Sequence, residues 1–194
     1  MNAGISIVIP AFNPQPRIFA RVLRAVAALE RPAGIEVDCT IVDNRSDPPL
    51  SEAAYIREFM EQQGRATLVR EERQGLTYAR LRGFRSTTEA LVVVFDDDNE
   101  PEPGYLKAAL ACAREWPSVG VWGPGTVDVE LLDVVPRAWE TRVRETHNER
   151  HEQHVQYGSV PASWQPYYPI GMGQVIRREV ADAYANAVDS GELS

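Results

Sequence analysis

The chain has 194 residues, of which 44% are hydrophobic and 25% are charged, and this composition is typical of a globular protein with one sizeable core. Its formal net charge of −8 argues against a nucleic-acid-binding surface, because phosphate recognition requires clustered positive charge. We therefore expect one domain and no nucleic-acid partner.

Cysteine usage and hydropathy narrow the class of protein further. Cys39 and Cys112 lie far apart in the sequence and form neither a metal-binding spacing nor a disulfide framework. No run approaches ~18 apolar residues, and Met1 to Gly4 lead directly into an apolar segment without a targeting signal. We expect a cytoplasmic protein without a transmembrane segment; peripheral membrane association and a homodimer both stay open.

Strand and helix signals alternate along the first half of the chain. Ile5–Ile9 is a β-branched run that Pro10 is expected to stop, and Ile18–Leu29 then places apolar residues on one helical face. The alternation continues with predicted strands at 36–42, 66–70 and 91–95 and predicted helices at 52–63, 75–87 and 102–115.

Strands separated by helices of this size require parallel pairing with right-handed crossovers. The sequence therefore predicts an α/β fold, a Rossmann-like layered sandwich in which helices cover both faces of a mostly parallel central sheet. The carboxyl ends of parallel strands share one edge, where ligands bind in such sheets. We expect the turn at Pro10 and the acidic turns at Asp43 and Asp96 to meet at that edge.

The pattern becomes irregular after a predicted strand at 119–122. A polar helix is predicted at 136–148, and a long irregular stretch follows it, of a kind that is often functional. A small-residue turn at 171–173 then leads into a short strand that ends at Arg177 and a last helix at 179–188.

Three consecutive carboxylates, Asp96, Asp97 and Asp98, end the apolar run 91–95. Adjacent carboxylates repel one another, so a fold that holds them at a strand end usually offsets the repulsion with a cation or with hydrogen-bond donors. Carboxylate oxygens suit magnesium or manganese. The alternative is a solvated acidic turn, because Asp and Asn are ordinary turn residues.

Four motifs, in this order along the chain, resemble those of the family 2 glycosyltransferases, which have the GT-A fold. They are Ile7–Asn13, Ile41–Ser46, Gly75–Gly83 and Val94–Asp98, and the resemblance covers most of residues 4 to 179. It implies a hexosyl-type glycosyltransferase that depends on Mn²⁺ or Mg²⁺. Such an enzyme moves a sugar from a nucleotide diphosphate sugar to an acceptor hydroxyl with inversion, and the expected donor is a UDP-sugar.

The resemblance also implies a biological setting and an acceptor class. The acceptor would be a saccharide, a lipid-linked molecule or another hydroxyl compound, in polysaccharide or cell-envelope biosynthesis. Residues 1–118 would form the half that binds the nucleotide-sugar donor, and residues 119–194 the acceptor-side half.

Donor-binding roles follow from the matched motifs. The resemblance assigns nucleotide-sugar binding to Pro10, Phe12, Asp43, Asn44, Gly75, Arg80, Asp96 and Asp97. It makes Asp98, with Asp96, the metal-binding part of a DxD motif. For Phe12 core packing is the alternative, and for Asp43 it is an Asx-turn. Leu81 departs from the family pattern, which has Asn at that position.

Acceptor-side roles are implied for small residues and an aromatic residue in the second half: Trp122, Gly123, Gly171, Met172 and Gly173. Glycine lets a sugar approach the backbone because it lacks a side chain. Further aromatic residues would either stack on sugar faces or pin the loops to the core, namely Trp139, Trp164, Tyr167 and Tyr168.

An inverting transfer needs a general base, which the family carries in an acidic motif that would lie beyond Ser194. The catalytic residue is therefore unknown. Either an earlier carboxylate such as Asp128 or Glu130 serves, or the chain is a fragment, or it is a non-catalytic nucleotide-sugar-binding module.

The three histidines, His147, His151 and His154, follow a spacing that would put them on one helical face. They could be metal ligands, but a solvated helix face is the better interpretation because no carboxylate second shell accompanies them.

Overall fold

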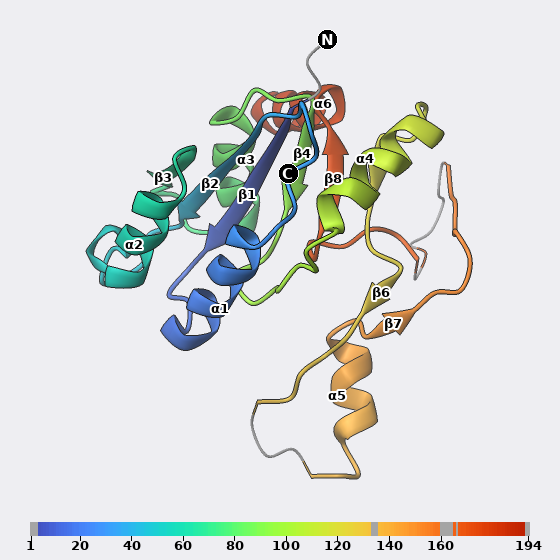
Figure 1. The fold of residues 1–194 in the computed structure, drawn as a ribbon, viewed down its shortest axis with the longest axis horizontal. Coiled ribbons are helices and arrows are strands. Elements are labelled where there is room, and N and C mark those ends of the chain that lie inside the picture. The colour runs from blue at the N-terminus through green and yellow to red at the C-terminus, as the bar shows by residue number, and fades with distance from the viewer. Residues whose placement is uncertain (1–3, 133–135, 160–164, 166, 193–194) are drawn as a thin grey trace.

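The computed structural model describes residues 4–132, 136–159, 165 and 167–192, so Trp164 lies outside the described residues. Within them, a six-stranded sheet in the order β3-β2-β1-β4-β8-β5 forms the centre of the molecule (Figure 1). Its strands are β1 (Ile5–Ala11), β2 (Val37–Asp43), β3 (Ala66–Arg70), β4 (Leu91–Val94), β5 (Val121–Trp122) and β8 (Gln174–Arg177).

The first four strands of the sheet are parallel, and β8 runs antiparallel to both β4 and β5. The helices are α1 (Pro16–Ala27), α2 (Ala54–Gln62), α3 (Leu76–Arg85), α4 (Tyr105–Glu115), α5 (Glu140–Thr146) and α6 (Arg178–Asp189), with a 3-10 turn at Leu50–Glu52. The predicted mostly parallel α/β sandwich is confirmed.

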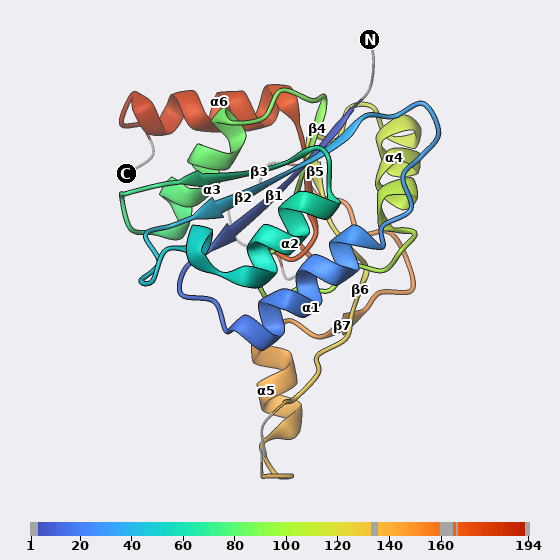
Figure 2. The ribbon, with the colours of Figure 1, turned by 60° about the vertical axis from the view of Figure 1, so that its left-hand side comes forward.

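Helices cover both faces of the sheet, because successive residues of each strand point to opposite sides. One core joins alternate residues of β1 to α1, α2 and α4: Ile5, Ile7, Ile9, Phe19, Val22, Ile56 and Leu106. The other joins the remaining strand residues to α3 and α6: Val8, Val42, Val92, Val94, Ala79, Phe84 and Ala181. Figure 2 shows α1 and α2 in front of the sheet and α3 and α6 behind it.

Pro10 does not stop the first strand, which continues to Ala11 and pairs with β2 along its whole length. Val8 accepts a hydrogen bond from Phe95 on the β4 side, whereas Ala11 accepts one from Asn44 on the β2 side. Residues two apart face the same neighbour, so the nitrogen of Pro10 faces β4, which has already ended. The missing N–H therefore removes no sheet hydrogen bond.

Helix α1 begins two residues earlier than the predicted 18–29, with Gln15 as its N-cap and Pro16 in the first turn. Proline is favoured there because its fixed φ suits the helix and its absent N–H would have no intrahelical partner.

A second region projects from the sheet layers and is built from a short antiparallel ladder and α5 (Figure 1). The ladder pairs β6 (Thr126–Val127) with β7 (Arg150–His151), and no residue of α5 is buried. The sequence did not predict this ladder, because strands of two residues carry no periodicity.

The three histidines do not share a helical face. Helix α5 ends at Thr146, His147 is its C-cap, and Asn148 has a φ of 61° that the helix cannot continue through. His151 lies in β7 and His154 in the exposed segment after it. The expected helix at 136–148 is therefore shorter, and the metal-ligand interpretation loses its geometry.

Among the described residues, no helix combines the length and the apolar character that crossing a bilayer requires.

Helix α3 packs closely on β1 at Gly83. A Cβ atom there would overlap Val8 Cγ1 and lie 3.3 Å from Val8 Cγ2, and Val8 is fully buried. We expect Gly83→Ala to lower the free energy of unfolding by about 1–3 kcal/mol, because a packed core resists added volume. Gly64→Ala is the control in urea unfolding, since its Cβ would meet no atom within 4 Å. Equal effects of the two substitutions would contradict this packing.

Candidate functional site

The carboxyl ends of β1, β2 and β4 meet at one edge of the sheet, which we call the rim. Ala11 pairs with Asp43 and Val8 with Val94 in parallel registers, so the loops that follow these strands leave the sheet on the same side. The predicted meeting of the Pro10, Asp43 and Asp96 turns is therefore confirmed at the level of the backbone.

The Asp43 carboxylate is almost fully buried and takes three donors from the chain. Oδ1 accepts from the backbone N–H of Ser46 at 2.7 Å, and Oδ2 from that of Leu50 at 3.1 Å. The Arg70 guanidinium lies 2.8 Å from Oδ2. The carboxylate thus holds its own loop, although its bonds reach residues i+3 and i+7 and not the i+2 position of an Asx-turn. Contact with a base or ribose stays a prediction.

Asn44 ties the end of β2 to the loop before α3. Its Nδ2 donates to the carbonyls of Glu71 at 3.3 Å and Arg73 at 2.7 Å, and its Oδ1 accepts from the N–H of Gly75 at 2.8 Å. Gly75 has a φ of 138°, which a residue with a side chain rarely adopts. The amide thus fixes the start of α3, the helix that carries Arg80.

Sequence reasoning missed Glu71 and Arg73 in this loop. The Arg73 side chain and N–H donate to Glu71 at 3.0 and 2.9 Å, and these bonds hold the pKa of the Glu71 carboxyl below its usual value. The Arg73 guanidinium also lies 4.6 Å from the centre of the Tyr78 ring, which is half exposed at the rim. Neighbouring acidic and basic residues in a loop are too common to have indicated this cluster.

A tight turn shapes the Asp96–Asp98 loop. Asn99 Oδ1 accepts from the Asp96 N–H at 3.0 Å, and Asn99 Nδ2 donates to Asp98 Oδ1 at 2.9 Å. The side chain of Asn99 therefore ties the backbone of Asp96 to the carboxylate of Asp98. The one sequence signal for this role is that asparagine is a common turn residue.

Negative charge accumulates in this loop. Burial, followed by the charge of Asp98, raises the pKa of Asp97 to about 6. Burial also raises the pKa of Asp96, although the Arg80 guanidinium 3.5 Å away opposes this rise. A cation beside these carboxylates would reduce their mutual repulsion.

Within the described residues, no three His, Cys, Asp or Glu side chains converge as a complete metal-ligand set. Asp98 is exposed and Asp96 half-buried, so both face a space open to solvent. Mg²⁺ typically uses one or two carboxylates and completes its coordination with water and ligand phosphates. The donor set therefore fits a cation held jointly with a diphosphate.

Arg80 lies beside Asp96, and its Nε is buried without a hydrogen-bond partner among the described residues. This position joins α3 to the acidic loop of the rim. Leu81, where the family pattern has Asn, is buried and supplies no polar group to the loop. Phe12, the residue after β1, is 45% exposed, whereas Pro10 is buried within the strand.

The turn 171–173 seats directly on the rim. A Cβ atom on Gly171 would overlap Arg80 Nη2 and lie 2.9 Å from Asp96 Oδ2. Gly173 has a φ of 69°, and a Cβ there would lie 2.7 Å from the hydroxyl oxygen of Tyr105, which donates to the Gly173 carbonyl. Because glycine has no side chain, these two positions leave room for the side chains of Arg80, Asp96 and Tyr105. The approach of a sugar to this backbone stays a prediction.

The other residues expected on the acceptor side are Gly123, Met172 and Trp122. A Cβ on Gly123 would lie 3.3 Å from Pro169, and Met172 is half-buried within the turn. Trp122 is half-buried under the Arg177 guanidinium, 5.4 Å from the centre of its ring system. Its Nε1 has no hydrogen-bond partner among the residues described.

The expected aromatic platforms are dispersed. Trp139 is 57% exposed at the start of α5, on the projecting region. The rings of Tyr167 and Tyr168 meet edge to face at 5.4 Å, a packing contact that suits loop pinning.

The two earlier carboxylates considered as general bases are engaged with other side chains. Glu130 forms an ion pair with Arg21, which also contacts Glu100 at 2.7 Å, and Asp128 lies 3.6 Å from His151. The general base stays unassigned.

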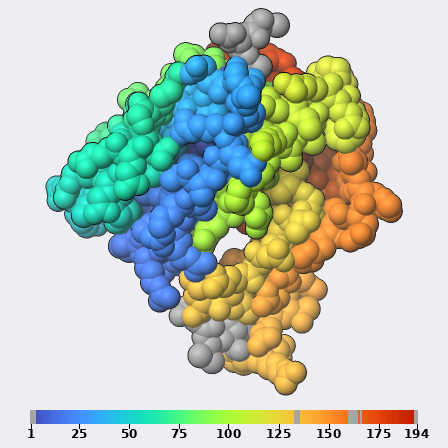
Figure 3. Space-filling model, in the orientation of Figure 1, coloured from blue at the N-terminus to red at the C-terminus, as the bar shows by residue number. Residues whose placement is uncertain are grey.

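Figure 3 shows the surface hollowed between the light-green chain that follows β4 and the yellow chain that leads towards α5.

The two glycines of the turn should respond differently to substitution. We expect Gly173→Ala to lower the free energy of unfolding by about 1–3 kcal/mol, because its φ is left-handed and the Tyr105 ring cannot move aside. Gly171→Ala should cost less than about 1 kcal/mol, because the flexible ends of Arg80 and Asp96 can shift.

Urea unfolding of both variants measures this difference, and Tyr105→Phe supplies the background in which Gly173→Ala should become milder. A larger loss for Gly171→Ala than for Gly173→Ala would contradict the seating of the turn.

A model of glycosyl transferase family 2 matches residues 6–184 of the chain. No curated protein matches it. Among solved structures, residues 1–349 of S. aureus TarS superpose with a TM-score of 0.65 at 16% identity, covering 93% of this chain and 48% of that one. The chain thus spans about half the length of this structure.

Two other solved structures are also similar to most of this chain. Mannosyltransferase PcManGT from Pyrobaculum calidifontis matches with a TM-score of 0.62 at 20% identity, over 94% of this chain and 47% of that one. M. tuberculosis glucosyl-3-phosphoglycerate synthase matches with a TM-score of 0.55 at 17% identity, over 92% and 58%. The structural likeness establishes the fold, the family match extends over most of the sequence, and the chain therefore belongs to glycosyl transferase family 2 and has the GT-A fold.

Proposed function

We propose that this chain binds a nucleotide diphosphate sugar together with Mn²⁺ or Mg²⁺ and transfers the sugar to an acceptor hydroxyl with inversion. The observation that carries the proposal is the acidic loop 96–98 at the rim, in a chain of this family. Its exposed Asp98 and half-buried Asp96 suit a cation that a diphosphate also holds.

Similar proteins support the choice of ligand. PcManGT was solved with GDP-Man and Mn²⁺, and TarS 1–349 with UDP-GlcNAc and with UDP. We propose a UDP-sugar as the donor and a hexose as the transferred group; a guanosine donor is the competing choice.

The chain's residues divide the work of donor binding. Asp98 and Asp96 would hold the cation, which offsets the negative charge that gathers on the departing nucleoside diphosphate. Phe12 offers an exposed ring for the base, and Asn44 and Gly75 keep the neighbouring loop in place. Arg80 adds a positive charge next to Asp96.

The acceptor half is proposed to be residues 119–194, facing the donor half 1–118 across the rim. A saccharide or lipid-linked hydroxyl of cell-envelope or polysaccharide biosynthesis would enter on the side of Trp122, Gly123 and the turn 171–173. Cytoplasmic location and a homodimer belong to this proposal as well.

A non-catalytic nucleotide-sugar-binding module is the second candidate. The ion pair of Glu130 with Arg21 favours it, because that carboxylate is not free to take a proton from the acceptor. Transfer or hydrolysis of a radiolabelled nucleotide sugar separates the two candidates, since a module would bind the donor without either reaction.

Calorimetry with UDP and with GDP, each with Mn²⁺ or with a chelator, tests donor binding. We expect binding to require the metal and Asp98→Ala to raise the Kd about 100-fold or more, because the cation joins the protein to the diphosphate. Glu58→Ala, which removes an exposed carboxylate of α2, should bind as the unaltered chain does. Metal-independent binding that Asp98→Ala leaves intact would remove the basis of the proposal.

A further inference from the structure

One partly buried arginine of the acceptor half lacks a partner. In the described part of the chain, the half-buried arginines are Arg21, Arg80, Arg144, Arg150, Arg177 and Arg178. Side-chain contacts to carboxylates or backbone carbonyls engage Arg21, Arg80, Arg144, Arg177 and Arg178. The guanidinium of Arg150 has neither kind of contact within the described residues, and this sets it apart from the other five.

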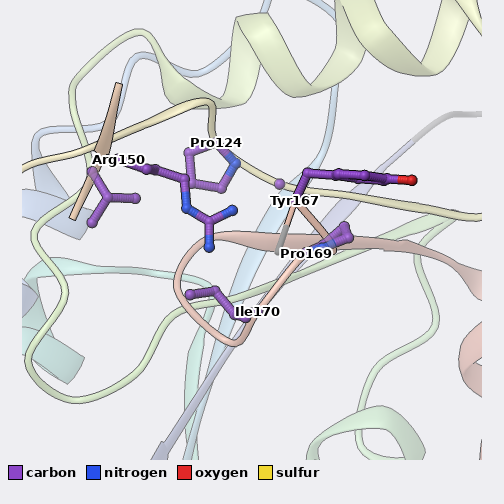
Figure 4. Close-up of a pocket in the computed structure, with 7 residues that line it drawn as sticks. Pro124, Arg150, Tyr167, Pro169 and Ile170 are labelled. Carbon is purple, nitrogen blue, oxygen red and sulfur yellow. The ribbon is translucent and has the colours of Figure 1, made fainter. Parts of the chain in front are cut away.

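Arg150 extends from β7 into a small cavity of about 30 Å³. The cavity is lined by Gly123, Pro124, Val127, Arg150, Tyr167, Pro169 and Ile170. Figure 4 shows the guanidinium between Pro124 and Ile170, with no acidic side chain among the lining residues.

The carboxylate adjacent to Arg150 in the sequence is already engaged. Glu149 accepts from Arg144 at 2.8 Å and from the Val129 N–H at 3.3 Å. A partly desolvated cation without a counter-charge is costly, so an anion that enters this space would be favoured. The planar guanidinium presents its donors in a fork that matches the oxygens of a carboxylate or phosphate.

The cavity adjoins the rim through the turn 171–173. Pro169 and Ile170 form its wall and lead directly into Gly171, whose backbone rests on Arg80 and Asp96. The cavity therefore lies on the acceptor side of the acidic loop. With a volume of about 30 Å³ it admits one or two oxygen atoms of an oxyanion and not a sugar ring.

We propose that Arg150 binds an oxyanion of the acceptor, a carboxylate or a phosphate, and that the acceptor of this chain is therefore anionic. This inference rests on the proposed transferase function for the identity of the ligand as an acceptor. The anion-binding site itself rests on Arg150 and its cavity alone.

Thermal-shift and calorimetric titrations with inorganic phosphate and with acetate, at constant ionic strength, test the site; glycerol is the uncharged probe. We expect Arg150→Gln to weaken binding of the preferred anion at least about tenfold, because a charge-assisted pair is lost. The anion affinity of Arg150→Lys should lie between that of the unaltered chain and that of Arg150→Gln, because lysine keeps the positive charge but lacks the planar, forked set of donors. Arg142→Gln is the matched control, an exposed arginine of α5 whose loss should change nothing.

The relative affinities of phosphate and acetate identify the kind of oxyanion. Phosphate and acetate binding that survives in Arg150→Gln, or that falls equally in Arg142→Gln, would overturn the site. Binding of UDP with Mn²⁺ is measured in the same variants and should be unaltered. A parallel loss of UDP binding in Arg150→Gln would overturn the acceptor assignment and make the donor diphosphate the occupant. Absence of UDP binding in every variant, with anion binding retained, would refute the proposed function and leave the Arg150 site standing.

Discussion

The buried Asp43 carboxylate is the interaction on which the rim depends. It closes the loop after β2 by accepting from Ser46 and Leu50, and it holds the last residue of β3 through Arg70. Asn44, the next residue, holds the start of α3 in the same way. Two adjacent side chains therefore arrange the loops from two strands around one edge. Replacing either would leave buried donors or acceptors unpaired, which costs more than the bond itself contributes.

The rim collects charge of both signs within a short distance. The acidic loop carries more negative charge than Arg80 neutralises, and this excess is the physical reason that the site suits a cation. On the proposed acceptor side the imbalance is reversed, because none of the residues that line the cavity of Arg150 is acidic. A chain with a formal net charge of −8 thus keeps an unneutralised cation beside the place where an acceptor would enter.

The layered sheet, its rim and the acidic loop could be predicted from the sequence, because apolar periodicity and turn residues are local signals. Local signals also misled: Pro10 continues β1 because the neighbouring strand has already ended, and the histidine spacing suggested a helix that stops at Thr146. The roles of Gly171 and Arg150 could not be predicted, because they depend on contacts between segments distant in the sequence. Asn99 had a visible turn signal, but its bonds to the Asp96 N–H and to the Asp98 carboxylate could not be predicted from that signal.

Gly171 packs against Arg80 and Asp96, and this contact limits which residues position 171 can accept. A side chain at this position would displace Arg80 and Asp96, the groups proposed to bind the donor, so a change made for a new acceptor would also disturb the proposed donor site. The projecting region with α5 has no such constraint, since none of its helical residues is buried. Under the proposed function, engineering of acceptor choice is therefore best directed to the surface of that region, with the turn 171–173 left unchanged.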